Sequence, residues 1–301
     1  MELTYDKEYT DELVNNIIER YGGSGVKRVG THVSDLTGPC LRASWGKHNI
    51  PEDQWLQEAP EDSPMVMWSQ GLQFEDLIGP GTPQVPKAYC PSCNAISTVP
   101  PPTITDDGLE EVAKCTVCKT RWLIGTPDYN IDGIIHEVKQ TRKSQRHGPA
   151  NAPWWIEQIK SYMFFARISN ADARNWGRLV VNWLMGDYGS KKKGERPRPP
   201  RSAIEAFKVS FDDTEWPLWK DELLRRKQIV EGPTMPPLNG MGEGDERSPA
   251  YDWACSSCPV GKAMGCEMFI WDDDDQVISK EEVLYTGYSG DGEVVYMGSI
   301  G

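Results

Sequence analysis

The sequence lacks the features that would place a protein in a membrane or outside the cell. No apolar run approaches the ~18 residues of a membrane-spanning helix. The first residues, 1–6, are acidic and have no apolar stretch typical of a secretory signal. We therefore expect a cytoplasmic protein, in the host cytoplasm if a phage encodes it, where thiols stay reduced. Eight cysteines in such a chain indicate metal ligands rather than disulfides.

Basic residues are also fewer than acidic residues, which gives the chain a formal net charge of −13 at pH 7. This excess of acid argues against a simple nucleic-acid binder, since phosphate binding needs local positive charge. Residues 271–301 hold eight acidic residues and one lysine, so they contribute a net charge of −7 (8 − 1 = 7), over half of the total negative excess. Such a composition is typical of a solvated tail. Residues 191–201 hold six basic residues and one glutamate (6 − 1 = 5 positive), so they are either a nucleic-acid contact or a solvated loop.

Helix and strand patterns alternate along the chain, which predicts an α/β fold. The predicted helices cover residues 11–21, 70–78, 154–168 and 214–230. The predicted strands cover residues 122–131, 134–139, 179–184 and 206–211.

The dipeptide Asp132-Gly133 predicts a tight hairpin, because a type I′ turn needs positive φ at both central positions. Counting outward from this turn places Asp128 opposite Glu137, with Cβ atoms about 5 Å apart on one face. Lys139 points to the same face. Adjacent acids repel unless a cation lies between them, so the hairpin predicts a divalent-metal site. The alternative is an exposed hairpin on whose wet face Lys139 pairs with one acid.

Two predicted helices carry polar residues that support the interpretation of the hairpin as a metal site. Gln158 and Tyr162 stand four residues apart and share one face of an otherwise apolar helix. Glu75 offers a third acid near Gly71, and Asp76 replaces it if the helix is rotated.

Four motifs follow one another in the order typical of RecB-type and lambda-exonuclease-type nucleases. They are Gly-x-x-x-Glu at 71–75, Gly-x-Pro-Asp at 125–128, Glu-Val-Lys at 137–139 and Gln-x-x-x-Tyr at 158–162. The chain thus resembles PD-(D/E)xK nucleases of the RecB-like iron–sulfur exonuclease type. The resemblance implies a restriction-endonuclease-like mixed sheet flanked by helices.

The resemblance also implies roles for the site residues. The catalytic Mg²⁺ or Mn²⁺ would be bound by Glu75, Asp128, Glu137 and the backbone carbonyl of Val138. Lys139 would be the catalytic lysine, and Gln158 and Tyr162 would contact DNA or steady the site. Many iron–sulfur members of the family carry His where Glu75 stands. The resemblance therefore does not decide whether the site binds one catalytic metal ion or two.

Two CxxC pairs, Cys90/Cys93 and Cys115/Cys118, are separated by 21 residues. Four thiolates at such spacing make a closed, structural Zn²⁺ site, so we predict an inserted zinc ribbon that faces DNA or a partner. Free buried cysteines are the alternative.

The other cysteines, Cys40, Cys255, Cys258 and Cys266, combine one residue near the start with three near the end. Thiolates suit zinc and iron–sulfur clusters alike. The one-plus-three pattern resembles the [4Fe-4S] cluster that clips the ends of the nuclease domain in RecB-type helicase-nucleases and CRISPR-associated exonucleases. Such a clip would stabilise the fold by restricting the unfolded chain.

The expected organisation has five segments. They are the N-terminal helical part of the nuclease domain (1–87), the zinc-ribbon insertion (88–120), the nuclease core (121–232), the iron–sulfur segment (233–270) and the acidic tail (271–301).

The resemblance implies a Mg²⁺/Mn²⁺-dependent deoxyribonuclease, an exonuclease acting at single-stranded or resected DNA ends in recombination, repair or CRISPR adaptation. The alternatives are a catalytically idle DNA-end-binding subunit of a larger complex and an electron-transfer protein, although a ferredoxin-like cysteine run is missing. A phosphate-binding loop is missing too, so a helicase partner would be a separate chain. The candidate DNA contacts are Arg42, Arg142, Lys143, Arg146, Lys191, Lys192 and Lys193.

Overall fold

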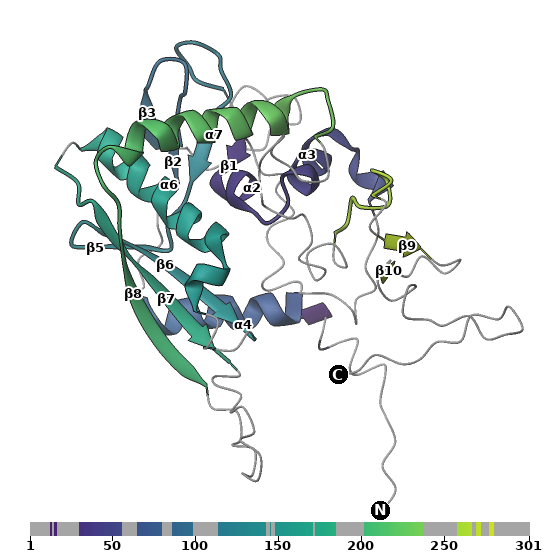
Figure 1. Ribbon diagram of the computed structural model, residues 1–301, viewed down its shortest axis with the longest axis horizontal. Helices are drawn as coiled ribbons and strands as arrows, with labels where there is room; N and C mark the ends of the chain where they lie inside the picture. The colour runs from purple at the N-terminus through teal and green to yellow at the C-terminus, as the bar shows by residue number, and fades with distance from the viewer. Residues whose placement is uncertain are drawn as a thin grey trace, which may run out of the picture. The chain divides into compact units, whose positions relative to one another are not determined.

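The computed structural model has a mixed α/β architecture with two mixed four-stranded sheets (Figure 1). It describes residues 13, 15–16, 30–55, 65–79, 86–98, 114–142, 145, 148–170, 172–184, 202–236, 258–266, 269–271 and 277–279. The chain divides into a first unit, residues 1–37 and 58–227, and a second unit, residues 38–57 and 228–301. None of the helices within the described ranges is long and apolar enough to cross a membrane.

One sheet of the first unit has the strand order β5-β6-β7-β8. β5 (Tyr129–Ile131) is antiparallel to β6 (Ile134–Thr141), β6 is parallel to β7 (Trp176–Trp183), and β7 is antiparallel to β8 (Ala203–Ser210). A parallel pair needs a long crossover, and α6 (Pro153–Ser169), preceded by the short turn η4 (Pro149–Asn151), supplies it.

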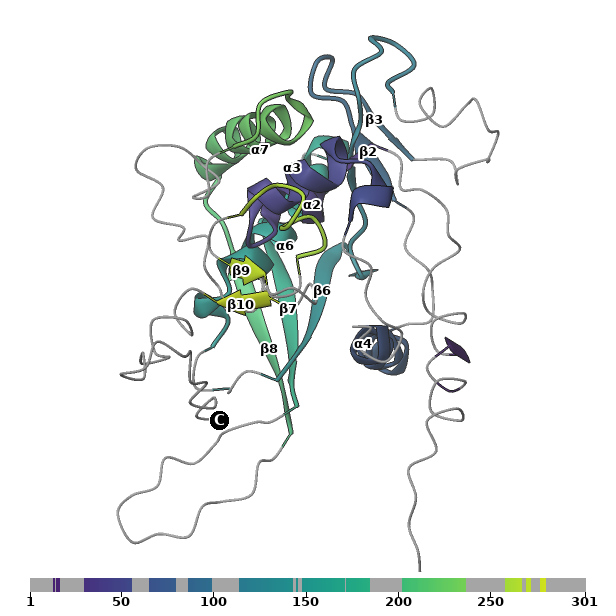
Figure 2. The same ribbon diagram turned by 90° about the vertical axis from the view of Figure 1, so that its right-hand side faces the viewer.

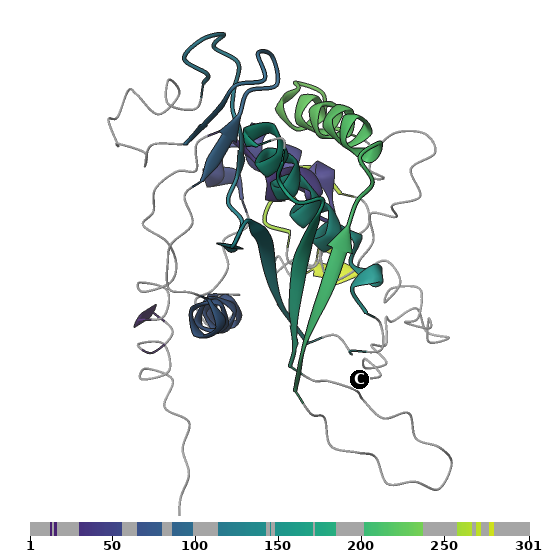
Figure 3. The same cartoon turned by 90° about the vertical axis from the view of Figure 1, so that its left-hand side faces the viewer.

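Helix α6 packs against one face of this sheet (Figures 1 and 3). A Cβ on Gly177 of β7 would lie 3.0 Å from the Ile159 side chain and 3.1 Å from that of Met163, so glycine permits the close approach. Leu179 and Val181 follow on the same face of β7 and are fully buried. The main core therefore lies between α6 and the sheet.

The other sheet is built around β4 (Leu123–Gly125) and has the order β1-β4-β2-β3. β1 (Thr31–His32) is parallel to β4, β2 (Lys87–Tyr89) is antiparallel to β4, and β3 (Ile96–Thr98) is antiparallel to β2. Segments from both sides of residues 99–113 therefore share one sheet.

The sequence predicted one strand over residues 122–131, whereas the structure has two strands in different sheets there. Thr126, Pro127 and Asp128 separate β4 from β5, and Pro127 has no N–H with which to continue a strand ladder. The remaining predicted helices and strands differ from the observed ones by a few residues at their ends. Helix α4 (Met65–Ile78) begins five residues earlier than predicted, and most of the helix predicted over 11–21 lies outside the described residues.

The second unit joins helix α3 (Leu41–Asn49) to segments from the other end of the chain. The Trp45 indole donates a 2.8 Å hydrogen bond to the carbonyl of Gly232, and a Cβ on Gly46 would lie 2.7 Å from Met264 Sδ and 2.8 Å from Val260. The unit also contains the turn η1 (Glu52–Gln54) and the antiparallel strands β9 (Phe269–Trp271) and β10 (Val277–Ser279). Most of the predicted acidic tail lies outside the described residues.

Arg226 on helix α7 (Glu215–Glu231) is a buried cation that is 1% exposed. Its guanidinium pairs with Glu157 of α6 at 2.8 Å and with Glu222 at 2.6 Å. It also donates to the carbonyl of Leu36 in α2 (Val33–Thr37) at 3.0 Å. One side chain therefore ties three helices of the first unit together.

Replacing Arg226 by alanine should lower the free energy of unfolding by about 3 kcal/mol, because it removes a buried cation from two carboxylates. The matched control is Arg225→Ala, whose side chain is 40% exposed and pairs with Glu222. We expect this control to cost less than about 1 kcal/mol. Urea unfolding followed by circular dichroism measures both, and equal losses would contradict the interpretation of Arg226.

Candidate functional site

The hairpin that precedes β6 has the register predicted from the sequence. Asp132 and Gly133 have φ values of 52° and 76°, as a type I′ turn requires. The paired residues are Tyr129 with His136, Asn130 with Ile135 and Ile131 with Ile134. The next residue, Asp128, accepts a 2.6 Å hydrogen bond through Oδ2 from the backbone N–H of Val138. Asp128 is therefore fixed beside the Glu137–Val138 backbone.

Glu137 is a fully buried carboxylate at the centre of the site. Its Oε1 forms an ion pair with the Lys139 ammonium. Its Oε2 is buried and has no hydrogen-bond partner in the described part of the protein. An unsatisfied buried acceptor costs roughly 1–3 kcal/mol, so the orphaned oxygen is the kind of atom that a bound cation satisfies.

Helix α4 brings Glu75 to the same site. The Tyr129 hydroxyl donates a hydrogen bond to the backbone carbonyl of Glu75. A Cβ on Gly79, just beyond the helix, would overlap the Tyr129 ring. Views from two sides show α4 beside β6 (Figures 2 and 3). Asp76, the alternative acid, is exposed, whereas Glu75 is half-buried and interacts with Asp128.

The site has three carboxyl groups, those of Glu75, Asp128 and Glu137, and one ammonium, that of Lys139. The pKa values of all three carboxyl groups are raised. Burial and then the charge of Asp128 raise the pKa of Glu75 to about 7, against the opposing effect of Lys139. Burial raises the pKa of Glu137 to about 8, with Lys139 opposing and Asp128 adding to the shift. Burial also raises the pKa of Asp128. Excess negative charge on clustered oxygen ligands fits a hard divalent cation.

Lys139 remains the positive partner in this cluster. Burial lowers its pKa, but the charges of Glu137, Asp128 and Glu75 outweigh burial and hold the pKa above its usual value. A charged ammonium therefore stays beside Glu137 Oε1.

The pair predicted on α6 is also in place. The Gln158 amide donates a 2.9 Å hydrogen bond to the hydroxyl of Tyr162. A Cβ on Gly125 would lie 3.0 Å from the Tyr162 ring, so this ring packs against the end of β4, three residues before Asp128. Tyr129 was not predicted as a site residue, because its link to α4 depends on contacts between segments fifty residues apart.

The two CxxC pairs come together as predicted. In the described part of the chain, Cys90, Cys93, Cys115 and Cys118 are the group whose ligand atoms all lie within 4.8 Å of one another. The Sγ separations are 3.1 Å between Cys90 and Cys118, 3.7 Å between Cys93 and Cys115, and 3.9 Å between Cys93 and Cys118. A tetrahedral Zn²⁺ site with Zn–S bonds of ~2.3 Å needs sulfur atoms about 3.8 Å apart. This group can hold a metal ion such as zinc.

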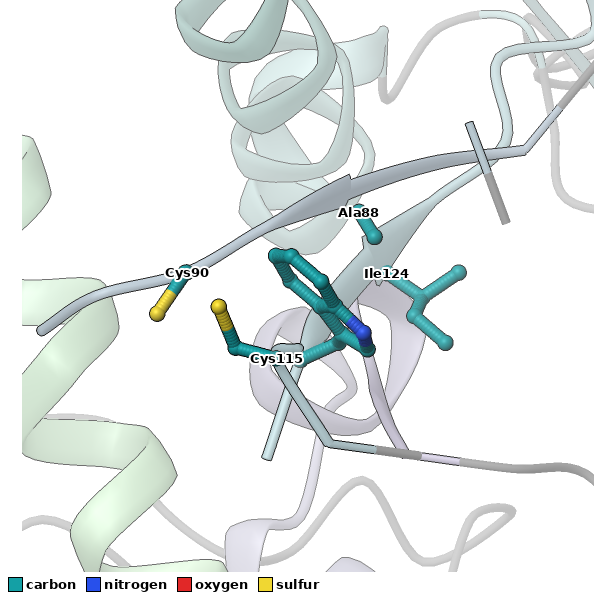
Figure 4. Packing of buried hydrophobic residues seen from close by; sticks show 5 residues of the cluster. Ala88, Cys90, Cys115 and Ile124 are labelled. Atoms are coloured by element: carbon teal, nitrogen blue, oxygen red, sulfur yellow. The ribbon is translucent and has the colours of Figure 1, made fainter. Parts of the chain in front are cut away.

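The two knuckles repeat the same backbone geometry. Cys90 N–H donates to the carbonyl of Ala95 and Cys115 N–H donates to that of Thr120, both at 2.8 Å. The residue after each second cysteine, Asn94 or Lys119, has a φ of 58° or 63°. The sulfur atoms of Cys90 and Cys115 lie near each other (Figure 4), and both residues belong to one buried cluster with Ala88 and Ile124. Both knuckles are thus continuous with the packed sheet around β4.

Three of the other four cysteines, Cys40, Cys258 and Cys266, belong to the second unit. Burial raises the pKa of the Cys258 thiol, and the nearby Cys40 and Cys266 raise it further. Burial likewise raises the pKa of Cys266, with Arg42 opposing. Cys255 lies outside the described residues.

The predicted DNA contacts fall into different environments. Arg42 is 9% exposed, and its guanidinium lies 3.2 Å from Met235 Sδ, so it packs inside the second unit. Arg142 is exposed at the end of β6. The other candidates, Lys143, Arg146, Lys191, Lys192 and Lys193, lie outside the described residues.

A chelator-treated protein should lose stability as pH rises, because burial raises the pKa of Glu137 above its value in the unfolded chain. Its folded pKa of about 8 exceeds its usual value of 4.5, so its contribution is complete below about pH 4.5 and is lost through pH 8. Glu137→Gln should reduce this loss by on the order of 3 kcal/mol. Chemical unfolding at several pH values between 5 and 8.5 (roughly the titration range) measures it. An unchanged pH dependence would show that Glu137 ionises freely.

The geometry of the four-cysteine group predicts that its thiolates bind one zinc ion. Cys93→Ser and Cys118→Ser alter exposed ligands, and each should remove about one equivalent of zinc and lower the melting temperature, because metal binding adds to folding free energy. Elemental analysis measures the zinc, with Cys258→Ser as the control that should retain it. Full zinc content in both knuckle variants would place the ion elsewhere.

Comparisons with known proteins add one distant structural likeness. Neither a protein-family model nor a curated protein matches the chain. The crystal structure of SSO0001 aligns with 84% of this chain and 94% of that chain, at 14% sequence identity and a TM-score of 0.43. A likeness at this TM-score supports no conclusion about fold or function.

Proposed function

We propose that this protein is a divalent-metal-dependent DNA nuclease of the PD-(D/E)xK type with a restriction-endonuclease-like core. The observation that carries the proposal is the buried Glu137 carboxylate, which has Lys139 on one oxygen and no partner on the other in the described residues. Asp128 lies across the hairpin, and Glu75 approaches from α4. Two adjacent acids and a lysine form the constellation that phosphodiester hydrolysis uses.

The residues present fit a hard cation. Glu75, Asp128, Glu137 and the backbone carbonyl of Val138 would hold Mg²⁺ or Mn²⁺, because all offer oxygen ligands. The ion, when bound, supplies Lewis acidity toward the phosphate and lowers the pKa of a coordinated water. Lys139 keeps a positive charge next to Glu137, where it can orient the attacking water and stabilise charge developing on the phosphate. Gln158 and Tyr162 would steady the site or contact the DNA backbone.

The two cysteine sets would serve the fold rather than the chemistry. Four thiolates leave no open position for water, so zinc at the knuckles would be structural. A [4Fe-4S] cluster on Cys40, Cys255, Cys258 and Cys266 would clip the early and late segments of the second unit together. The contacts of α3 with Gly232 and Met264 support such a clip.

The decisive experiment follows hydrolysis of an end-labelled oligonucleotide in Mg²⁺ or Mn²⁺. Lys139→Ala and Glu75→Gln should each lower the rate by about a hundredfold or more, while circular dichroism stays unchanged. Asp76→Asn is the matched control, because this acid is exposed one residue from Glu75, and we expect a rate within about threefold of the parent. Full activity in Lys139→Ala would refute the assignment. DNA binding without hydrolysis would favour the idle end-binding subunit.

A further inference from the structure

Strands β7 and β8, with Arg174 just before β7, carry a group of cations around one indole, outside the acidic site. We define the basic patch as Arg174, Trp176, Arg178 and Lys208. The Arg174 and Arg178 guanidinium carbons lie 5.5 Å from the Trp176 ring centroid, and Lys208 Nζ lies 4.8 Å from it. All three cations are exposed. Cation–π attraction to one ring therefore holds three positive charges together.

The strand register also sets two of these cations directly against each other. Arg178 and Lys208 are directly opposed in the antiparallel β7–β8 pair. Like charges in that position destabilise a sheet. Neither residue forms an ion pair with a carboxylate among the residues that the structure describes. A bound anion would relieve the repulsion.

A buried histidine positions one of the cations. His136 is 6% exposed, and its Nε2 lies 3.4 Å from Arg178 Nη1. Its Nδ1 lies 2.9 Å from the carbonyl of Ile134, to which it donates as N–H, so Nε2 can accept from Arg178.

The patch and the acidic site occupy opposite faces of one sheet. Glu137 pairs with Leu179, which faces α6, while Arg178 pairs with His136. Adjacent residues of a strand point to opposite faces, so Arg178 points away from the Glu137 side.

We propose that the basic patch binds the phosphates of a nucleic-acid strand. Charge complementarity supports this proposal, because three exposed cations stand together on this face of a chain whose net charge is −13. Guanidinium groups match phosphate oxygens in geometry as well as charge. The inference deepens the proposed function, on which it rests for the identity of the polyanion, by adding a contact surface behind the catalytic sheet face.

Lys208→Glu separates binding from stability. The new carboxylate would face Arg178, so a cross-strand ion pair replaces the repulsion and the melting temperature should rise. At the same time, binding to a labelled single-stranded oligonucleotide should weaken. Loss of one phosphate contact lowers the slope of log affinity against log salt by about 0.7, which corresponds to an affinity about fivefold lower at 0.1 M salt. Fluorescence anisotropy in excess chelator measures affinity without hydrolysis.

Lys47→Glu is the control, since it makes the same charge change at an exposed position of α3. The triple variant Arg174→Ala/Arg178→Ala/Lys208→Ala should lower the salt slope by roughly 2. Affinity and slope equal to the control in Lys208→Glu would overturn the proposal, and so would a parent protein that binds no oligonucleotide. Weakened binding by Lys208→Glu, in a protein that never hydrolyses DNA, would support the patch and refute only the nuclease assignment.

Discussion

The two-residue turn at Asp132-Gly133 sets the register on which the acidic site depends. Because side chains alternate along a strand, a slip of one residue would turn Glu137 and Lys139 to the other face of the sheet. In the observed register, Asp128 accepts the N–H of Val138, and Glu137 points into the core beside Lys139. Lys139 offsets part of the cost of burying Glu137, so turn, sheet and site form one structural unit.

Strand β4 links this site to the four-cysteine group. It lies between β1 and β2, and the chain passes from Gly125 through Thr126 and Pro127 directly to Asp128. Cys90 follows β2, while Cys115 and Cys118 precede β4, so an ion held by these thiolates would fasten the two strands together. The knuckles therefore belong to the framework that positions Asp128, which explains why they pack with Trp122 and Ile124 rather than standing apart.

Local chemistry explains which features could be read from the sequence. The hairpin register follows from a turn that demands positive φ, and the knuckles follow from two short cysteine spacings. The position of α4 beside the site could not be predicted from the sequence, because it depends on a contact between Tyr129 and Gly79, fifty residues earlier. The basic patch was missed for a similar reason: Arg178 and Lys208 become neighbours only through the β7–β8 register. The strand predicted over 122–131 ignored the missing N–H of Pro127.

The acidic site is tested most directly by locating a metal ion in it. Crystals of the protein soaked in Mn²⁺ should give an anomalous scattering peak between Asp128 and Glu137, within about 2.3 Å of carboxylate oxygens. Glu137 Oε2, which is buried without a partner in the described residues, should be among the ligands. Crystals that diffract well and show Lys139 still paired with Glu137, but no Mn²⁺ peak at these acids, would contradict a hydrolytic metal centre.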